Sequence, residues 1–472
     1  MGQTMSKTSH AVLQCVSPVD GRIFVERPLH TLTDVDTALA RAKKAQKSWR
    51  NVPLTDKQKI VLKALDYFLA NTKEIAEELS CMIGRPVSQT PGEITRGFQE
   101  RIRYMTDLAP KALADVVPEA KDGFKRYLRR EPLGVVAIIA PWNYPYLTSA
   151  NGIIPALLAG NTVILKHSHQ TPLCADRYAA AFKLAGLPEG VFQFFDLSHD
   201  DTEKMIADPR VDYVNFTGSV KGGHAVQRAI SGKFIAAGLE LGGKDPAYVR
   251  ADADLKFTVE NLVDGAFFNS GQSCCGIERI YVHENLYKDF VEGFVELTKT
   301  YKLGNPMEAA TNLGPMVRTA AATFVREQTQ DAIRRGAKAL IDEKLFPASK
   351  SGTPYLAPQV LVDVNHSMPA MMEETFGPVV GIMKVKSDTE AIALMNDSPY
   401  GLTASLWTPD LTAAEKIGQE IDTGTVFMNR CDYVDPGLSW TGVKDTGRGA
   451  TLGAVGFEHL TRPKSFHLRT KI

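Results

Sequence analysis

The chain has 472 residues, of which 44% are apolar, and its 54 basic side chains balance 54 acidic ones. That length is enough for two or more domains, and the charge balance argues against a nucleic-acid binder or a protein held at a membrane by bulk charge. No apolar run is long enough to span a bilayer, and no secretory segment opens the chain. The six cysteines lack disulfide-framework spacing and the ten histidines lack metal-ligand spacing, so we expect a cytoplasmic protein without a metal.

The first six residues, MGQTMS, match the pattern for N-myristoylation. The alternative is that Met5 is the natural start of the chain. We favour this alternative, because no polybasic patch or second lipid site follows to make anchoring stable.

Helical periodicity with few glycines runs from about Asp34 to Leu108. From Leu133 onward, continuous apolar runs alternate with helical segments. We predict strands over 134–139, 162–165, 191–195, 211–216 and 234–237, with helices such as 173–184 and 202–206 between them. Such a pattern predicts a parallel sheet covered on both faces, and sheets of this kind bind ligands at the carboxyl ends of their strands.

A second α/β pattern begins after Asp245. It includes predicted strands at 279–282 and 379–383 and a predicted helix at 320–335. Two further segments, 124–130 and 465–469, alternate in character and are typical of strands with one polar face.

Three runs carry chemistry. The run FFNSGQSCCG at 267–276 puts thiols after a Gly-Gln pair, ELGGK at 240–244 supplies a carboxylate, and PWN at 141–143 supplies an amide. A lone cysteine is often only a small buried hydrophobe. Together, however, the runs offer a nucleophile, a base and an oxyanion donor, the parts needed for acyl chemistry through a thioester.

The run FTGSVKGG at 216–223 follows a predicted strand and opens a helix. Glycines there would let a phosphate approach the amides of the helix N-terminus. The alternative is an ordinary strand-to-helix turn, and the run is not the GxGxxG of the common dinucleotide fold. Lys166 ends a buried strand and is a candidate partner for ribose hydroxyls, although a solvated lysine at a strand end is commoner.

The chain resembles the aldehyde dehydrogenase superfamily over nearly its whole length. The motifs that carry the resemblance are PWN (141–143), Lys166, FTGS (216–219), ELGGK (240–244), GQSC (271–274), EETFGP (373–378) and PYGL (399–402). The resemblance implies oxidation of an aldehyde to a carboxylic acid with NAD or NADP.

The resemblance also implies an α/β fold of three parts. A Rossmann-like cofactor domain would comprise 1–113 and 133–242, a catalytic domain 243–459, and a bridging oligomerisation element of strands 114–132 and 460–472. In the family this element pairs with another subunit, so we expect a homodimer or homotetramer. A free edge strand in the tail would otherwise be a liability.

Roles for individual residues follow from the resemblance. The nucleophile stands two places after the Gly-Gln pair, which makes it Cys274, with Cys275 as a neighbour in the site. Asn143 would hold the oxyanion, and Glu240 would activate the water that hydrolyses the thioester. The residues assigned to the cofactor are Trp142, Lys166, His169, Gly218, Ser219, Gly223, Glu374 and Phe376.

Two departures from the family pattern matter. Many NAD-preferring members have a glutamate three places after the strand-ending lysine, where this chain has His169. A neutral imidazole does not repel a 2′-phosphate. When the pH falls to about 6.5, the reference pKa of histidine, the imidazole becomes protonated and attracts the phosphate. NADP use is therefore expected beside NAD, and more so at lower pH.

The second departure lies near the C-terminus, where the run is WTGVK (440–444) in place of an aromatic residue followed by Gly-Gly. The expected substrate tunnel is part aromatic and part polar, and no clear basic residue for an acidic substrate is found, although Arg430 is close in sequence. Tyr433 and Asp432 would lie near the tunnel, whose expected walls are Tyr144, Thr148, Asn151, Phe268, Cys275, Val434 and Trp440.

Two rival functions stay open. The first is a coenzyme-A-acylating dehydrogenase, in which a thiol takes the acyl group; Glu240 argues against it, because such an enzyme does not need a hydrolytic base. The second is a structural protein on the same fold without turnover, since fold alone never proves function. Cys274, Glu240 and Asn143 together argue against the second.

Overall fold

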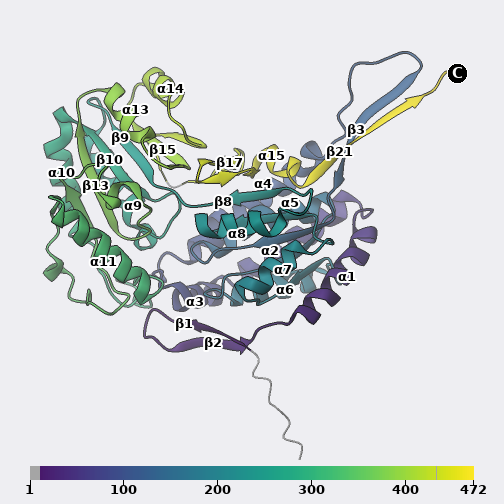
Figure 1. Ribbon diagram of the computed structural model, residues 1–472, viewed down its shortest axis with the longest axis horizontal. Helices are drawn as coiled ribbons and strands as arrows, with labels where there is room; N and C mark the ends of the chain where they lie inside the picture. The colour runs from purple at the N-terminus through teal and green to yellow at the C-terminus, as the bar shows by residue number, and fades with distance from the viewer. Residues whose placement is uncertain (1–10, 432) are drawn as a thin grey trace, which may run out of the picture.

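A computed structural model of the protein describes residues 11–431 and 433–472. The myristoylation pattern and Asp432 therefore lie outside the described residues. The β-structure of the described residues comprises two large sheets, a hairpin near the start of the chain, a projecting ribbon of two strands (Figure 1) and two short strand pairs near the C-terminus. Within the described ranges, every helix is too short or too polar to cross a lipid bilayer.

The first sheet has six strands in the order β19-β8-β7-β4-β5-β6. All neighbours are parallel except β19, which runs antiparallel to β8. The strands are β4 (Val135–Ile139), β5 (Thr162–Lys166), β6 (Phe192–Phe194), β7 (Tyr213–Thr217), β8 (Ala237–Glu240) and β19 (Gly447–Arg448).

The parallel sheet predicted from the apolar runs is confirmed, with one misplaced strand. The prediction put a strand over 234–237, whereas β8 begins at Ala237 and the side chain of Phe234 is fully exposed. Pairing with β7 sets this register, because Ala237 lies opposite Val214 and Glu240 opposite Thr217. The apolar run before Ala237 lies outside the sheet.

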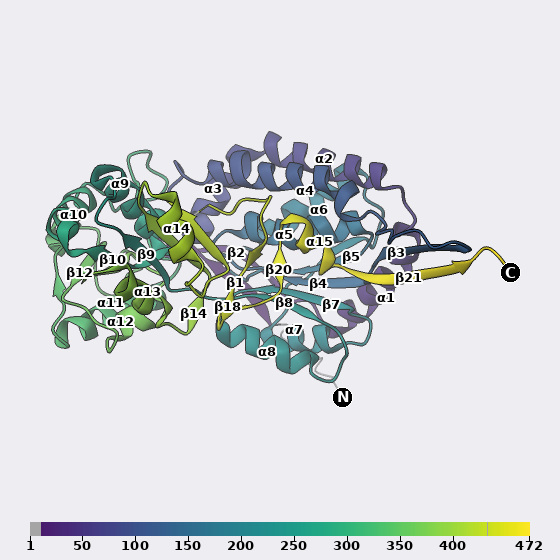
Figure 2. The ribbon, with the colours of Figure 1, turned by 90° about the horizontal axis from the view of Figure 1, so that it is seen from above.

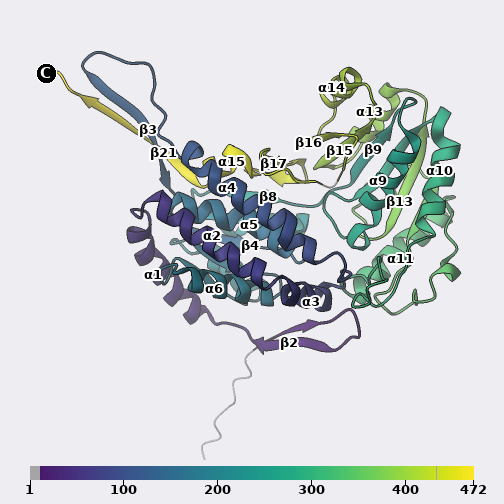
Figure 3. The same ribbon diagram turned by 180° about the vertical axis from the view of Figure 1, so that it is seen from behind.

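Helices cover both faces of the first sheet because its strands are apolar on both sides. In β4, Val135 and Ala137 pack toward α1, while Val136 and Ile138 pack toward α5. The first face is covered by α1 (Leu32–Trp49), α7 (His199–Ala207) and α8 (Val220–Ile230). The second face and its outer layer, seen in Figure 3, consist of α2 (Leu54–Ala70), α3 (Thr72–Ile83), α4 (Gln99–Ala112), α5 (Pro145–Ala159) and α6 (Leu173–Ala185).

The second sheet has seven strands in the order β11-β12-β13-β10-β9-β15-β16. The predicted strands at 279–282 and 379–383 are its central members. The strands are β9 (Asp245–Val249), β10 (Ile277–His283), β11 (Lys338–Ala339), β12 (Gln359–Val362), β13 (Val379–Val385), β15 (Thr403–Trp407) and β16 (Thr425–Met428). Around it pack α9 (Leu255–Phe267), α10 (Glu284–Thr298), α11 (Thr319–Arg334), α12 (Pro369–Met372), α13 (Asp388–Asn396) and α14 (Leu411–Gly418).

A ribbon of two antiparallel strands projects from the first sheet (Figures 1 and 2). It pairs β3 (Phe124–Pro132) with β21 (Thr461–Arg469), which bear out the polar-faced strands predicted there. Tyr127 and Phe466 stack with ring centroids 4.5 Å apart, and the Arg129 guanidinium lies 5.2 Å from each ring. The limits proposed for the three domains remain predictions.

Short elements complete the fold. The hairpin of β1 (Val12–Val16) and β2 (Ile23–Pro28) was not predicted. Near the C-terminus the chain returns from the second sheet to the first, where α15 (Gly453–Glu458) packs on α4 and α5. The remaining short strands are β14 (Tyr400–Gly401), β17 (Trp440–Thr441), β18 (Val443–Lys444) and β20 (Ala450–Thr451).

Candidate active site

A tight left-handed turn presents Cys274 after helix α9. Asn269, Ser270 and Gly271 have φ values of 53°, 56° and 70°, a conformation that non-glycine residues rarely adopt. A Cβ on Gly271 would collide with the carbonyl of Gly377, so this position requires glycine. The side chain of Gln272 fastens the turn: its Nε2 donates to the Asn269 carbonyl at 3.1 Å, and its Oε1 accepts from the Val317 N–H at 2.8 Å.

Cys274 lies where two cavities meet. One cavity, of about 400 Å³, runs between the two sheets and will be called the cofactor-side cavity. The other, of about 130 Å³, lies between α4, α5 and the turn that follows α9 and will be called the inner cavity. Cys274 lines both, whereas Cys275 lines only the inner one. Of the two thiols, Cys274 alone can therefore contact molecules bound on either side.

The surroundings of Cys274 hold its thiol in the protonated form. A hydrogen bond with Cys275 and burial both raise the pKa of Cys274 well above the ordinary value. A thiolate is the reactive form, so Cys274 needs a base or a bound ligand to become a nucleophile.

Asn143 lies beside Cys274 in the cofactor-side cavity and is buried. Its Nδ2 donates to the Gln272 carbonyl at 3.3 Å, a long hydrogen bond within the turn that carries the thiol. Its backbone carbonyl accepts from the Arg85 guanidinium. The backbone of Asn143 is therefore held firmly, while its amide keeps only a weak partner.

A buried ion pair that the sequence did not reveal supports Asn143. Arg85 Nη1 and Glu93 Oε2 are 2.6 Å apart. Glu93 also accepts from the N–H groups of Tyr146 and Leu147, at 2.9 and 3.3 Å, in the first turn of α5. The pair thus joins the start of α5 to the backbone of Asn143. Arg85 and Glu93 follow no recognised motif, so only their positions in space reveal them.

Glu240 ends β8 and is fixed by two hydroxyl groups. Thr217 Oγ1 donates to one carboxylate oxygen at 3.1 Å, and Thr451 Oγ1 donates to the other. Burial raises the pKa of Glu240, and the hydrogen bonds from Thr451 and Thr217 lower it in part. In this position Glu240 lies outside the described walls of both cavities that contain Cys274.

Five of the eight residues assigned to the cofactor line the cofactor-side cavity: Trp142, Gly218, Ser219, Glu374 and Phe376. Trp142 and Phe376 meet edge to face with centroids 5.7 Å apart. Glu374 accepts from the Gly243 N–H at 2.9 Å, and burial raises its pKa to about 7. Ser219 caps α8, whose N-terminus therefore opens at the edge of this cavity.

The other three residues assigned to the cofactor do not line this cavity. Burial lowers the pKa of Lys166, at the end of β5, to about 8. Nε2 of His169 lies 2.7 Å from the Leu197 carbonyl, so Nε2 carries the proton and Nδ1 is left as an acceptor. Gly223 is a packing residue, since a Cβ there would come within 2.7 Å of Leu241.

The structure revises the expectation that acid favours NADP through His169. Burial, with the nearby charge of Lys166, lowers the pKa of His169 below its ordinary value. The imidazole therefore stays neutral at pH values where an exposed histidine would be charged.

All seven residues expected in the tunnel walls line the inner cavity: Tyr144, Thr148, Asn151, Phe268, Cys275, Val434 and Trp440. Five residues of its wall were not expected: Arg101, Leu147, Gly265, Ser273 and Gly276. Arg101 comes from α4, far in sequence from the motifs, and it supplies the basic group that the sequence failed to indicate.

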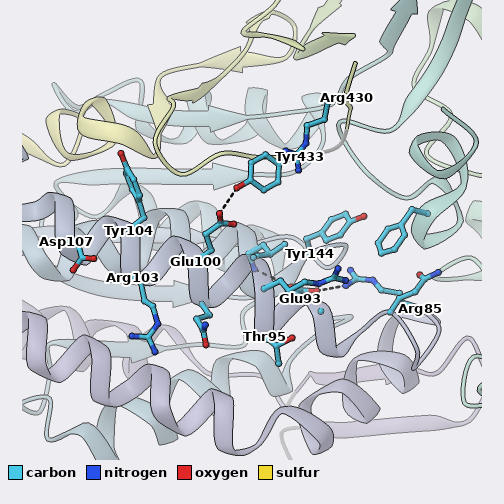
Figure 4. Close-up of a pocket in the computed structure, with 17 residues that line it drawn as sticks. Arg85, Glu93, Thr95, Glu100, Arg103, Tyr104, Asp107, Tyr144, Arg430 and Tyr433 are labelled. Atoms are coloured by element: carbon cyan, nitrogen blue, oxygen red, sulfur yellow. Dashed lines mark hydrogen bonds and ion pairs between the residues drawn. The ribbon is translucent and has the colours of Figure 1, made fainter. Parts of the chain in front are cut away.

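A wider outer cavity of about 850 Å³ continues from the inner one, because Tyr144, Leu147 and Phe268 line both. Figure 4 shows its walls, in which the Tyr433 hydroxyl donates to Glu100 at 2.5 Å. The Arg430 guanidinium stacks on Tyr433, 3.7 Å from the ring centroid. Arg430, the basic residue noted from its sequence position, therefore belongs to the outer cavity.

Comparisons with known proteins identify the family of the chain. Residues 4–466 match the aldehyde dehydrogenase family. The NAD(P)+ succinate semialdehyde dehydrogenase of Escherichia coli is 32% identical over 461 residues, which cover 97% of each chain.

Solved structures agree as well. Succinic semialdehyde dehydrogenase of Streptococcus pyogenes, in complex with NADP+ as the cofactor, has a TM-score of 0.92 at 27% identity, covering 97% of this chain and 100% of that one. NAD-dependent aldehyde dehydrogenase of Sinorhizobium meliloti has a TM-score of 0.93 at 31% identity. The match covers 99% of this chain and 93% of that one. A family match over nearly the whole length and a shared fold lead to one conclusion: the chain belongs to the aldehyde dehydrogenase family.

Proposed function

We propose that the protein oxidises an aldehyde to a carboxylic acid, with NAD or NADP as hydride acceptor, through a thioester on Cys274. The observation that carries this proposal is the position of Cys274 at the junction of two cavities. In such a reaction one carbon must bond to sulfur and face a hydride acceptor at the same time. A thiol that contacts both cavities meets this requirement.

The residues present fit a dinucleotide. The cofactor-side cavity has a volume of about 400 Å³, the N-terminus of α8 at its edge favours an anionic group, and the Glu374 carboxylate can accept hydrogen bonds from a ribose. Trp142 and Phe376 offer apolar surfaces to a ring. The nicotinamide, when bound, supplies the hydride acceptor.

The chain's own groups perform the first stage. Cys274 gives its proton to a water molecule, and its sulfur bonds to the aldehyde carbon, so the electron pair of the C=O double bond moves to oxygen. Asn143 Nδ2 gives up its long hydrogen bond to Gln272 and donates to this oxyanion. Loss of hydride from the same carbon re-forms the C=O bond and leaves a thioester.

Hydrolysis of the thioester is the task of Glu240. The carboxylate removes a proton from water, the hydroxide adds to the thioester carbon, and Cys274 leaves as thiolate with release of the acid. Because Thr217 and Thr451 hold Glu240 outside both cavities, its side chain must turn toward the thiol for this stage.

We expect both NAD and NADP to be used. The solved relatives include one named as NAD-dependent and one in complex with NADP+. At the position of the usual glutamate, His169 offers a neutral Nδ1 acceptor that does not repel a 2′-phosphate.

The test compares Cys274→Ala with Cys275→Ala in an aldehyde panel assayed for NADH and NADPH formation. Cys274→Ala should abolish turnover, while Cys275→Ala, which removes a wall of the inner cavity only, should keep substantial activity. If a folded Cys275→Ala variant were as inactive as Cys274→Ala, the choice of nucleophile would be wrong. An unmodified protein that reduced neither cofactor with any aldehyde would overturn the whole proposal.

The projecting ribbon supports a further part of the proposal, a homodimer or homotetramer. Its exposed strand pair presents stacked Tyr127 and Phe466 beside Arg129, a surface suited to burial against a second copy. Sedimentation of the full chain should give twice or four times the mass of one chain.

A further inference from the structure

Arg101 differs from the other buried arginines. Three arginines are buried in the part of the chain that the structure describes: Arg85, Arg101 and Arg279. In Arg85 and in Arg279, each of the three guanidinium nitrogens donates a hydrogen bond to a protein acceptor. A buried guanidinium is normally satisfied in this way, because an unpaired buried charge is costly.

Only one nitrogen of Arg101 is satisfied. Nη1 donates to the Leu147 carbonyl at 2.9 Å and to Asn151 Oδ1 at 3.1 Å. Nε is enclosed without an acceptor, while Nη2 is not enclosed and has no acceptor among residues 11–431 and 433–472. No carboxylate in those ranges forms an ion pair with Arg101. Since Arg101 lines the inner cavity, Nη2 is the donor that a bound molecule can reach.

Asn151 provides a second open donor next to the first. Its Oδ1 faces Arg101, which fixes the amide so that Nδ2 points the other way. Nδ2 has no acceptor among the described residues, and Asn151 lines the same cavity. Two adjacent donors, one of them charged, match the two oxygens of a carboxylate.

The cavity limits how far this group can lie from the reacting thiol. Arg101, Asn151 and Cys274 line one space of about 130 Å³, close to the roughly 150 Å³ of a cavity that holds benzene. A molecule that spans it has about six or seven non-hydrogen atoms. The remaining walls, among them Phe268, Val434 and Trp440, are apolar and would contact a short carbon chain.

We propose that Arg101 and Asn151 bind the carboxylate of a short aldehyde substrate, so that the protein acts on semialdehydes of small dicarboxylic acids. This inference rests on the proposed function and names its substrate class. The substrate carboxylate accepts from Arg101 Nη2 and Asn151 Nδ2, and its carbon chain passes the apolar wall. The aldehyde carbon then meets Cys274, which lines the same cavity.

The experiment compares matched substrates on the full-length protein. The acid is the semialdehyde of a four-carbon dicarboxylic acid, and its partner carries an uncharged amide in place of the carboxylate. The unmodified protein should favour the acid in kcat/KM by roughly 10- to 100-fold, the range expected for a buried hydrogen bond to a charged group. This comparison needs no variant.

Arg101→Gln should remove that preference, mainly through a larger rise in KM for the acid than for the amide. Arg101→Lys should retain part of the preference, because the charge remains but the paired geometry is lost. Lys111→Gln is the matched control: it removes one positive charge from the exposed last turn of the same helix and should change neither value.

Two results would overturn the assignment. One is an unmodified protein that oxidises the amide as well as the acid. The other is a folded Arg101→Gln variant that loses activity equally on both, which would make Arg101 a structural residue. If Arg101→Gln does not fold, competitive inhibition of the unmodified protein provides the test. The inhibition constant of a four-carbon dicarboxylate should be at least tenfold lower than that of its monoamide, and equal inhibition constants would contradict the proposal. Failure of the proposed function itself is distinct, since neither acid, amide nor plain aldehyde would then be oxidised.

Discussion

The hydroxyl of Thr451 should set the pH at which Glu240 works, and Thr451→Val tests this. Valine keeps the shape of the side chain and removes the donor to the carboxylate. A hydrogen bond to a charged group contributes about 1.5–3 kcal/mol, and 1.36 kcal/mol corresponds to one pKa unit. Because the hydrogen bond stabilises the ionised form, its loss should raise the pKa of Glu240 by about 1 to 2 units, beyond the increase that burial already causes.

The assay is the pH dependence of thioester hydrolysis, followed as the slow phase after a burst of reduced cofactor. Only ionised Glu240 can take a proton from water, so the acid limb of the profile should move to higher pH by about 1 to 2 units in Thr451→Val. Thr217→Val removes the other donor, at 3.1 Å, and should move the limb in the same direction. A limb that stayed in place, or moved to lower pH, in a folded Thr451→Val protein would refute this account of how Glu240 is tuned.

Three further predictions concern the proposed catalytic and cofactor groups. Glu240→Gln should leave the burst of reduced cofactor and slow the steady state; loss of the burst itself would assign Glu240 to activation of Cys274 instead. Asn143→Ala should lower kcat by roughly 10²–10³-fold with little change in cofactor affinity, as expected for one oxyanion donor, and near-normal turnover in a chemistry-limited assay would remove it from the mechanism. His169→Glu should shift kcat/KM toward NAD. In the parent protein burial lowers the pKa of His169, so any rise in the ratio of kcat/KM for NADP to kcat/KM for NAD should come at a lower pH than for an exposed histidine, whose pKa is about 6.5; a rise centred at or above about 6.5 would contradict this assignment.

Most of the fold could be predicted because short runs of apolar residues show which segments are buried. The continuous apolar runs at β4, β5 and β7 indicate strands with two covered faces, and the structure places them side by side. The strand over 234–237 was misplaced because hydrophobicity alone does not set register. Phe234 is apolar yet exposed, and the pairing of Glu240 with Thr217 decides where β8 lies.

The part of the site that could not be predicted consists of residues that act through position in space. Arg85, Glu93 and Thr451 belong to no motif, and each is polar in a segment that reads as ordinary helix or loop. For Arg101 the sequence does contain a signal. It lies three residues after Phe98 and four before Met105, both buried, so its position falls near the apolar face of α4. A charged residue there is a signal that periodicity analysis can detect.

The projecting ribbon has a consequence for the order in which the molecule can assemble during synthesis. Strand β3 pairs with β21, which the ribosome makes roughly 330 residues later. At about 5–20 residues per second, β3 waits on the order of tens of seconds for its partner. An unpaired strand is open to association with other nascent chains. In β3 that danger is countered by four positive charges, at Lys125, Arg126, Arg129 and Arg130, which repel an unpaired copy of the same strand on another nascent chain.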